Sequence, residues 1–188
     1  MEKINRSLLI KAHTLLAAFI LPVAIMFFVT GALYTWGIKG GTEKTTQELH
    51  IKAPIQGELT ELVALAKNEL QKQGVGLPSG NAKIKKIGSS FQLEWSGSTV
   101  NVVLAPTFQP LVVTLTIENA SWYRQLVQLH KAKGGIPFKV YATAFAIALL
   151  LLIISGFLMA LQMPKLRQLT LISALLSIAL FVVMVISS

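Results

Sequence analysis

Three histidines, His13, His50 and His130, are the side chains of this sequence best suited to holding a metal or cofactor. The chain has no cysteine and no aspartate, so its 8 acidic residues are all glutamates. This composition excludes Cys-ligated zinc, iron–sulfur clusters, thiol nucleophiles and a Ser-His-Asp triad. Histidine ligation, with methionine as a possible second ligand, is the chemistry that is left.

The sequence contains three long stretches without charge, and His13 lies at the start of the first. Of the 188 residues, 53% are hydrophobic and 13% are charged, against about 25% charged in an average soluble domain. The stretches run between Lys11 and Lys39, between Lys139 and Lys165, and onward from Arg167. A membrane-spanning helix needs about 20 apolar residues. The sequence therefore predicts three spanning helices, at residues 14–36, 140–161 and 169–186.

The short basic segments predict how these helices are oriented. Lys3, Arg6 and Lys11 precede the first span, and Lys165 and Arg167 lie between the second and third. Short segments rich in lysine and arginine stay in the cytoplasm. We therefore expect residues 1–13 and 162–168 to be cytoplasmic, and the central segment and the C-terminus to lie outside. We expect the first span to remain as an anchor, because its apolar run is longer than the about 7–15 residues of a cleavable signal peptide.

The central segment, residues 37–120, has the pattern of a small folded domain. Leu59, Leu62, Val63, Ala66 and Leu70 recur at helical spacing before Gly74, which predicts an amphipathic helix. Apolar and polar residues then alternate, as in half-buried strands. The predicted strands lie at residues 91–95, 100–104 and 111–117, with a shorter one near 82–87. The sequence thus predicts one main helix on a three- or four-stranded antiparallel sheet, an α+β layer.

A second amphipathic segment, residues 121–135, directly precedes the second span. Tyr123, Leu126 and His130 share one face, and we expect this helix to rest on the membrane surface. Its basic residues would meet anionic headgroups, which accounts for part of the net charge of +9. The segment has no recognisable nucleic-acid-binding motif, so no nucleic-acid partner is expected.

The order of these motifs resembles the small PepSY-associated transmembrane proteins. The first span follows Arg6 and His13 and ends in TGALYTW, and an LHKAKGG segment leads into a span ending in ISGFLMAL. Ser155-Gly156 stands where the family usually has Thr-Gly. The resemblance implies a multi-pass protein of the bacterial inner membrane. It also implies that the central domain is PepSY-like and extracytoplasmic. Together with the three predicted spans, this gives a membrane α-helical fold with an inserted extracytoplasmic PepSY-like α+β domain.

The resemblance also implies possible site residues. Larger relatives include ferric-siderophore reductase-type proteins that hold haem between membrane histidines, and this chain offers His13, His130 and Met163 as haem ligands, with Met159 as an alternative to Met163. In the predicted topology a hydrocarbon core of about 30 Å separates His13 from His130, so the two cannot ligate one haem. A dimer could supply a second His130.

These residues also have structural interpretations. His13 can sit at headgroup level, His130 can pack against Tyr123 or cap a helix end, and the methionines can fill apolar space. The dipeptides Thr30-Gly31 and Ser155-Gly156 can let helices approach closely. No glutamate lies inside a predicted span, so a carboxylate proton relay there has no candidate.

The leading functional hypothesis is a non-enzymatic accessory or regulatory protein. It is anchored in the lipid bilayer and binds another envelope protein, or a second copy of itself, through the external domain. One alternative is a haem-binding electron-transfer component in iron acquisition. If the protein is enzymatic, it would act in this way, as part of a haem-dependent membrane reductase. A second alternative is a peptidase inhibitor, because separate PepSY domains are associated with restraint of secreted peptidases.

Overall fold

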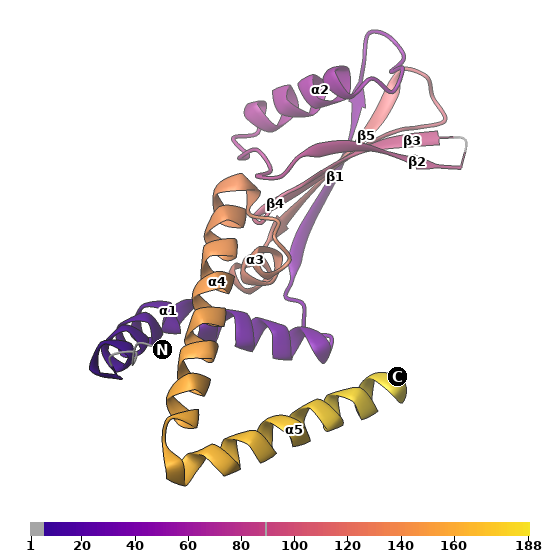
Figure 1. The fold of residues 1–188 in the computed structure, drawn as a ribbon. Coiled ribbons are helices and arrows are strands. Elements are labelled where there is room, and N and C mark those ends of the chain that lie inside the picture. Colours follow the sequence, from indigo (N-terminus) through magenta and orange to yellow (C-terminus); the bar gives the residue numbers. More distant parts are fainter. Residues whose placement is uncertain (1–5, 89) are drawn as a thin grey trace. The chain divides into compact units, whose positions relative to one another are not determined.

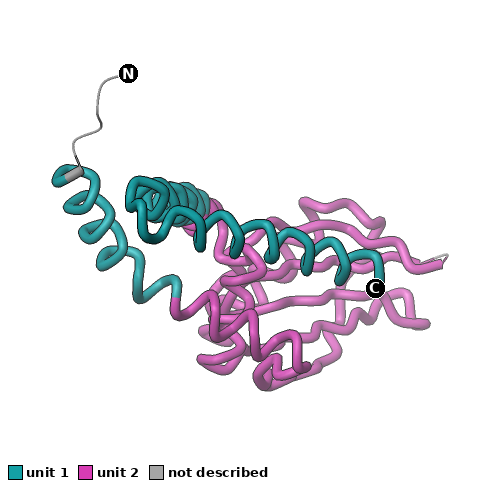
Figure 2. Tube along the Cα trace, turned by 60° about the horizontal axis from the view of Figure 1, so that its bottom comes forward, with its two compact units in different colours: residues 1–24, 143–188 teal, residues 25–142 magenta. Residues whose placement is uncertain are grey.

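A computed structural model describes residues 6–88 and 90–188 of the chain, in two compact units. One unit is formed by Ile25–Ala142, and the other by the chain up to Ala24 together with Thr143–Ser188 (Figure 2). Two helices, α1 (Arg6–Thr35) and α4 (Gly135–Leu161), contribute residues to both units.

The unit Ile25–Ala142 is built on a five-stranded antiparallel sheet in the order β1-β5-β4-β3-β2 (Figure 1). The strands are β1 (Thr42–His50), β2 (Ala82–Ile87), β3 (Ser90–Ser96), β4 (Val100–Pro106) and β5 (Val112–Ala120). The expected three or four strands are β2 to β5. The fifth, β1, was missed, so that strand count is wrong. The reason is that β1 reads TEKTTQELH and lies at a sheet edge with most of its side chains exposed, so it lacks the apolar alternation that marks a half-buried strand.

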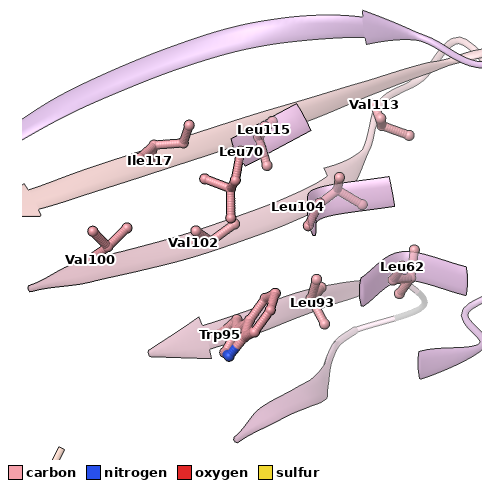
Figure 3. Close-up of a cluster of buried hydrophobic side chains, with 11 residues drawn as sticks. Leu62, Leu70, Leu93, Trp95, Val100, Val102, Leu104, Val113, Leu115 and Ile117 are labelled. Atoms are coloured by element: carbon pink, nitrogen blue, oxygen red, sulfur yellow. The ribbon is translucent and has the colours of Figure 1, made fainter. Parts of the chain in front are cut away.

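Helix α2 (Leu59–Lys72) covers one face of this sheet and completes the core (Figure 1). Its Leu62, Ala66 and Leu70 are fully buried, as the helical spacing predicted. They pack against the inward-facing side chains of β3, β4 and β5 (Figure 3), which are Leu93, Trp95, Val100, Val102, Leu104, Val113, Leu115 and Ile117. The apolar faces of helix and sheet thus bury one another, as the α+β prediction requires.

The opposite face of the sheet is polar. Thr46 of β1 and Thr116 of β5 pair there with their hydroxyls 3.3 Å apart. Glu94 of β3 forms ion pairs with Lys85, at 3.0 Å, and with Lys83, at 3.8 Å. A sheet with one packed and one polar face is the usual arrangement for an antiparallel layer that meets water on one side.

Three helices are long and apolar enough to cross a membrane, as the sequence predicted. They are α1, α4 and α5 (Pro164–Ile186). The apolar part of α1 runs from Ser7 to Thr35. Helix α1 continues through Pro22, and α5 starts directly at Pro164, a residue that suits the first helical turn. Of the basic residues used to predict orientation, Lys3 lies outside the described residues. The three helices make this a membrane protein.

Candidate functional site

His130 lies at the end of α3 (Trp122–His130) and contacts the C-terminal part of α1 within the unit Ile25–Ala142. Its Nδ1 is 2.9 Å from the Thr30 hydroxyl, and Thr30 is only 2% exposed. A Cβ at Gly31 would lie 3.2 Å from His130 Cε1, so the missing side chain makes room for the imidazole. The ring centroid is 4.9 Å from that of Phe27. The imidazole of His130 therefore packs against α1, with the ring of Phe27 beside it.

His13 has the same surroundings in the other unit. Its Nδ1 is 2.8 Å from the Ser155 hydroxyl of α4. A Cβ at Gly156 would lie 3.3 Å from His13 Cε1. Each histidine therefore meets one hydroxyl–glycine dipeptide on another helix. These histidines and dipeptides are recognisable in the sequence. Their pairing is not, since the dipeptides suggest only close helix packing.

The hydroxyl partners determine which imidazole nitrogen carries the proton. Thr30 Oγ1 donates to the Met26 carbonyl at 2.6 Å, and Ser155 Oγ donates to the Leu152 carbonyl at 2.9 Å. A hydroxyl has one proton to donate. Since each proton goes to the helix backbone, the hydroxyl oxygen must accept a hydrogen bond from the Nδ1–H of its histidine. The hydrogen-bond pattern thus assigns a proton to Nδ1 of both rings, and a neutral imidazole with this proton has a free lone pair on Nε2.

A cavity adjoins each histidine. The cavity beside His130 has a volume of about 420 Å³ and is lined by Thr30, Gly31, Tyr34, Thr35, Val127, His130 and Lys131. The cavity beside His13 has a volume of about 340 Å³ and is lined mostly by aliphatic side chains: Leu9, Ala12, His13, Leu16, Leu151, Ile154, Ser155 and Leu158. Both volumes fall at the lower end of the range for small-molecule sites, about 300–1,000 Å³.

Each cavity combines one imidazole with apolar walls, which are the kinds of group that hold a haem. A haem takes an axial imidazole nitrogen, and ligating histidines usually hold their other N–H in a hydrogen bond, as His13 and His130 do. A haem bound there would supply one-electron transfer. Met163 precedes α5 and Met159 lies in α4, and neither is among the residues that line the His13 cavity. Each cavity therefore offers one histidine as ligand.

The third histidine stands apart from this arrangement. His50 is the exposed last residue of β1 and pairs with Val112 of β5. Among the residues that the structure describes, no three or more His, Cys, Asp or Glu side chains gather into a group able to hold a metal ion.

Helix α3 also holds the segment that joins α1 to β1, which the sequence analysis did not predict. The Tyr123 hydroxyl donates to the Ile38 carbonyl at 3.3 Å, and Arg124 Nη1 donates to the Lys39 carbonyl at 3.2 Å. The backbone of Gly40 adopts a φ of +77°, and a Cβ there would lie 2.7 Å from the Arg124 backbone nitrogen. We call this set of contacts the α3 clamp. Three glycines between Trp36 and Thr42 were the only sequence signal of so close an approach.

Several cations gather around α3. The Nζ atoms of Lys39 and Lys131 lie 5.6 and 5.5 Å from the centroid of the Tyr34 ring, within the range of cation–π attraction. Burial lowers the pKa of Lys133, and the charges of Lys131 and Arg124 lower it further. This end of the unit is therefore electropositive.

Comparison with known protein families identifies the chain. The sequence model of the PepSY-associated TM region matches residues 2–162. The chain belongs to this family. The match covers the sheet unit and both histidine–hydroxyl pairs, and it ends before α5 begins. It confirms the family resemblance that the sequence motifs indicated. Comparisons with curated proteins and with solved structures gave no match.

Proposed function

We propose that this PepSY-associated TM protein is an accessory protein of the bacterial inner membrane that presents its sheet unit, outside the cytoplasm, to another envelope protein. The observation that carries the proposal is the α3 clamp together with the His130–Thr30 contact. The clamp joins α3 to the segment between α1 and β1, and His130 joins α3 to α1 itself. The sheet is thereby tied to its membrane anchor rather than carried on a free linker.

A fixed domain suits docking because little orientational freedom is lost when a partner binds. The Ser121 amide donates to the Gly41 carbonyl at 3.1 Å, directly before β1 starts at Thr42. Helix α2 occupies one face of the sheet and leaves the polar face, with Thr46 and Thr116, for a partner. The exposed edge of β1 offers unpaired backbone groups beside that face.

Site-specific photo-crosslinking in cells tests this proposal. A photoreactive amino acid at Thr46, on the polar face, is expected to give a discrete adduct of higher mass. The same probe at Lys67, an exposed residue of α2, serves as the control on the opposite side of the sheet. Replacing Gly40 by valine, which disrupts the clamp, is expected to weaken the Thr46 adduct. Absence of a discrete adduct at Thr46 would reject the docking role.

A second function, haem-based electron transfer, is favoured by one specific observation. Thr30 and Ser155 each accept the Nδ1–H of a histidine and leave its Nε2 free beside a cavity. Ligating histidines commonly hold their other N–H in a hydrogen bond of this kind, which fixes the orientation of the ring. Under this proposal His13 and His130 would be the residues of this chain that hold haem, and a dimer could supply a further ligand.

The absorption spectrum separates the two functions. Protein produced with ample haem and carrying it would show a Soret band, and His13→Ala or His130→Ala would remove the band or part of it. Ser155→Ala and Thr30→Ala would shift the band, because the ligating ring loses the acceptor of its Nδ1–H. A colourless wild-type protein would reject haem binding and leave the docking role standing.

A further inference from the structure

The mouth of the His130 cavity is cationic, and neither proposed function accounts for this. Lys131 lines the cavity, and Lys39 approaches the same Tyr34 ring. Both lysines are exposed. The salt bridges that the structure describes join Lys72 to Glu69, and Lys83 and Lys85 to Glu94. Within the described part of the chain, neither Lys39 nor Lys131 forms a salt bridge.

The mouth lies beside the ends of two helices that are long and apolar enough to cross a membrane, which favours a position near the lipid headgroups. Helix α1 ends at Thr35 and α4 begins at Gly135, and both termini belong to this unit. Trp36, next to the end of α1, is 85% exposed, and exposed Trp and Tyr side chains mark the membrane interface. Behind the lysines, Gly31, Val127 and the ring of Tyr34 provide apolar wall. The site therefore joins an apolar cavity to two positive charges at the membrane surface.

We propose that this cavity binds an anionic phospholipid. The lipid phosphate lies between the ammonium groups of Lys39 and Lys131, and part of an acyl chain occupies the apolar wall region. Charge complementarity favours this ligand, because neither Lys39 nor Lys131 forms a salt bridge within the described residues. An apolar cavity behind a basic rim favours a ligand that carries its charge at one end, as a phospholipid does. The site does not involve the polar face of the sheet and is therefore independent of the docking role, but it occupies the His130 cavity and so excludes a haem there.

Native mass spectrometry of the full chain in detergent tests the proposal. The purified protein is titrated with dioleoyl phosphatidylglycerol, which is anionic, and with dioleoyl phosphatidylcholine, which is zwitterionic. The test variant is Lys39→Gln/Lys131→Gln. The control variant is Lys67→Gln/Lys86→Gln, which removes the same charge from exposed lysines of α2 and β2.

We expect the wild type to retain phosphatidylglycerol in preference to phosphatidylcholine. One lysine near an anionic surface is worth about fivefold in affinity, so the test variant should bind phosphatidylglycerol about 25-fold more weakly. The control variant should bind it as the wild type does. A Lys131→Arg variant, which keeps the charge, should also retain the preference and shows that charge rather than folding is responsible.

Three outcomes would overturn the proposal. One is a wild type with no preference for phosphatidylglycerol. Another is an equal loss of binding in the test and control variants, which would assign the effect to net charge alone. The third is co-purification of haem that is lost only in the Lys39→Gln/Lys131→Gln variant, which would assign the two lysines to porphyrin carboxylates.

Discussion

Removing the Thr30 hydroxyl is the most direct test of how α3 is attached to α1. In Thr30→Val the side chain keeps its shape but no longer accepts the Nδ1–H of His130. It also loses its bond to the Met26 carbonyl, at 2.6 Å. Thr35→Val is a close control, because the Thr35 hydroxyl also donates to a carbonyl of its own helix, at 2.6 Å. The difference between the two variants therefore reports the contact with His130.

The expected size of this difference follows from the environment of the bond. Hydrogen bonds between membrane helices contribute about 0.6 kcal/mol on average and up to about 1.7 kcal/mol. A polar group left without a partner in a buried position costs about 1–3 kcal/mol. Thr30 is 2% exposed, so water cannot easily replace its hydroxyl. We expect Thr30→Val to lower the free energy of unfolding by about 1–2 kcal/mol, and Thr35→Val by less than about 0.5 kcal/mol.

The assay is reversible unfolding in detergent micelles, followed by the melting temperature. A change of 1 kcal/mol corresponds to about 2–4 °C for a chain of this size. Hydrogen exchange of the α3 amides should also accelerate in Thr30→Val but not in Thr35→Val. Thr30→Ser retains a hydroxyl and should restore most of the stability.

Equal melting temperatures for Thr30→Val and Thr35→Val would refute this account of the His130 contact. So would equal destabilisation by Thr30→Val and Thr30→Ser, because the loss would then come from the methyl group and its packing. Either result would also remove the basis for assigning the Nδ1–H tautomer to His130.

Three further predictions concern the sheet unit. Gly40 and Gly37 both have positive φ, but only at Gly40 would a Cβ meet the backbone of α3; Gly40→Ala should therefore cost more than the about 1 kcal/mol expected for Gly37→Ala, measured as unfolding free energy. Trp95→Phe removes an Nε1–H bond of 2.8 Å to a backbone carbonyl and should destabilise the unit by about 1 kcal/mol, visible as a lower melting temperature. Hydrogen bonding to a lysine lowers the pKa of Glu94 below its ordinary value of 4.5. The ionised Glu94 carboxylate therefore stabilises the unit at pH values above 4.5, and this contribution is lost as the pH falls through the lowered pKa. Glu94→Gln should remove this pH dependence from the unfolding free energy measured below about pH 4.5. An unchanged dependence of stability on pH in that range would contradict the prediction.

The elements with strong apolar patterns were predictable from the sequence because burial imposes a period. The three uncharged stretches correspond to α1, α4 and α5, and the spacing of Leu62, Ala66 and Leu70 marked the buried face of α2. Strand β1 could not be found in this way. It is held by backbone hydrogen bonds to β5 at a sheet edge, and backbone pairing leaves no pattern in the side chains.

For the candidate site, too, the residue types can be known from the sequence and the contacts only from the structure. The sequence by itself determined which residue types were present: three histidines, no cysteine or aspartate, and two hydroxyl–glycine dipeptides in apolar segments. Only the tertiary structure decided the pairs, because His130 and Thr30 are 100 positions apart and His13 and Ser155 are 142 positions apart. Contacts at such separations depend on how helices pack and not on local spacing. The tautomer of each ring follows from those contacts, since it is the proton of the facing hydroxyl that determines which imidazole nitrogen stays free.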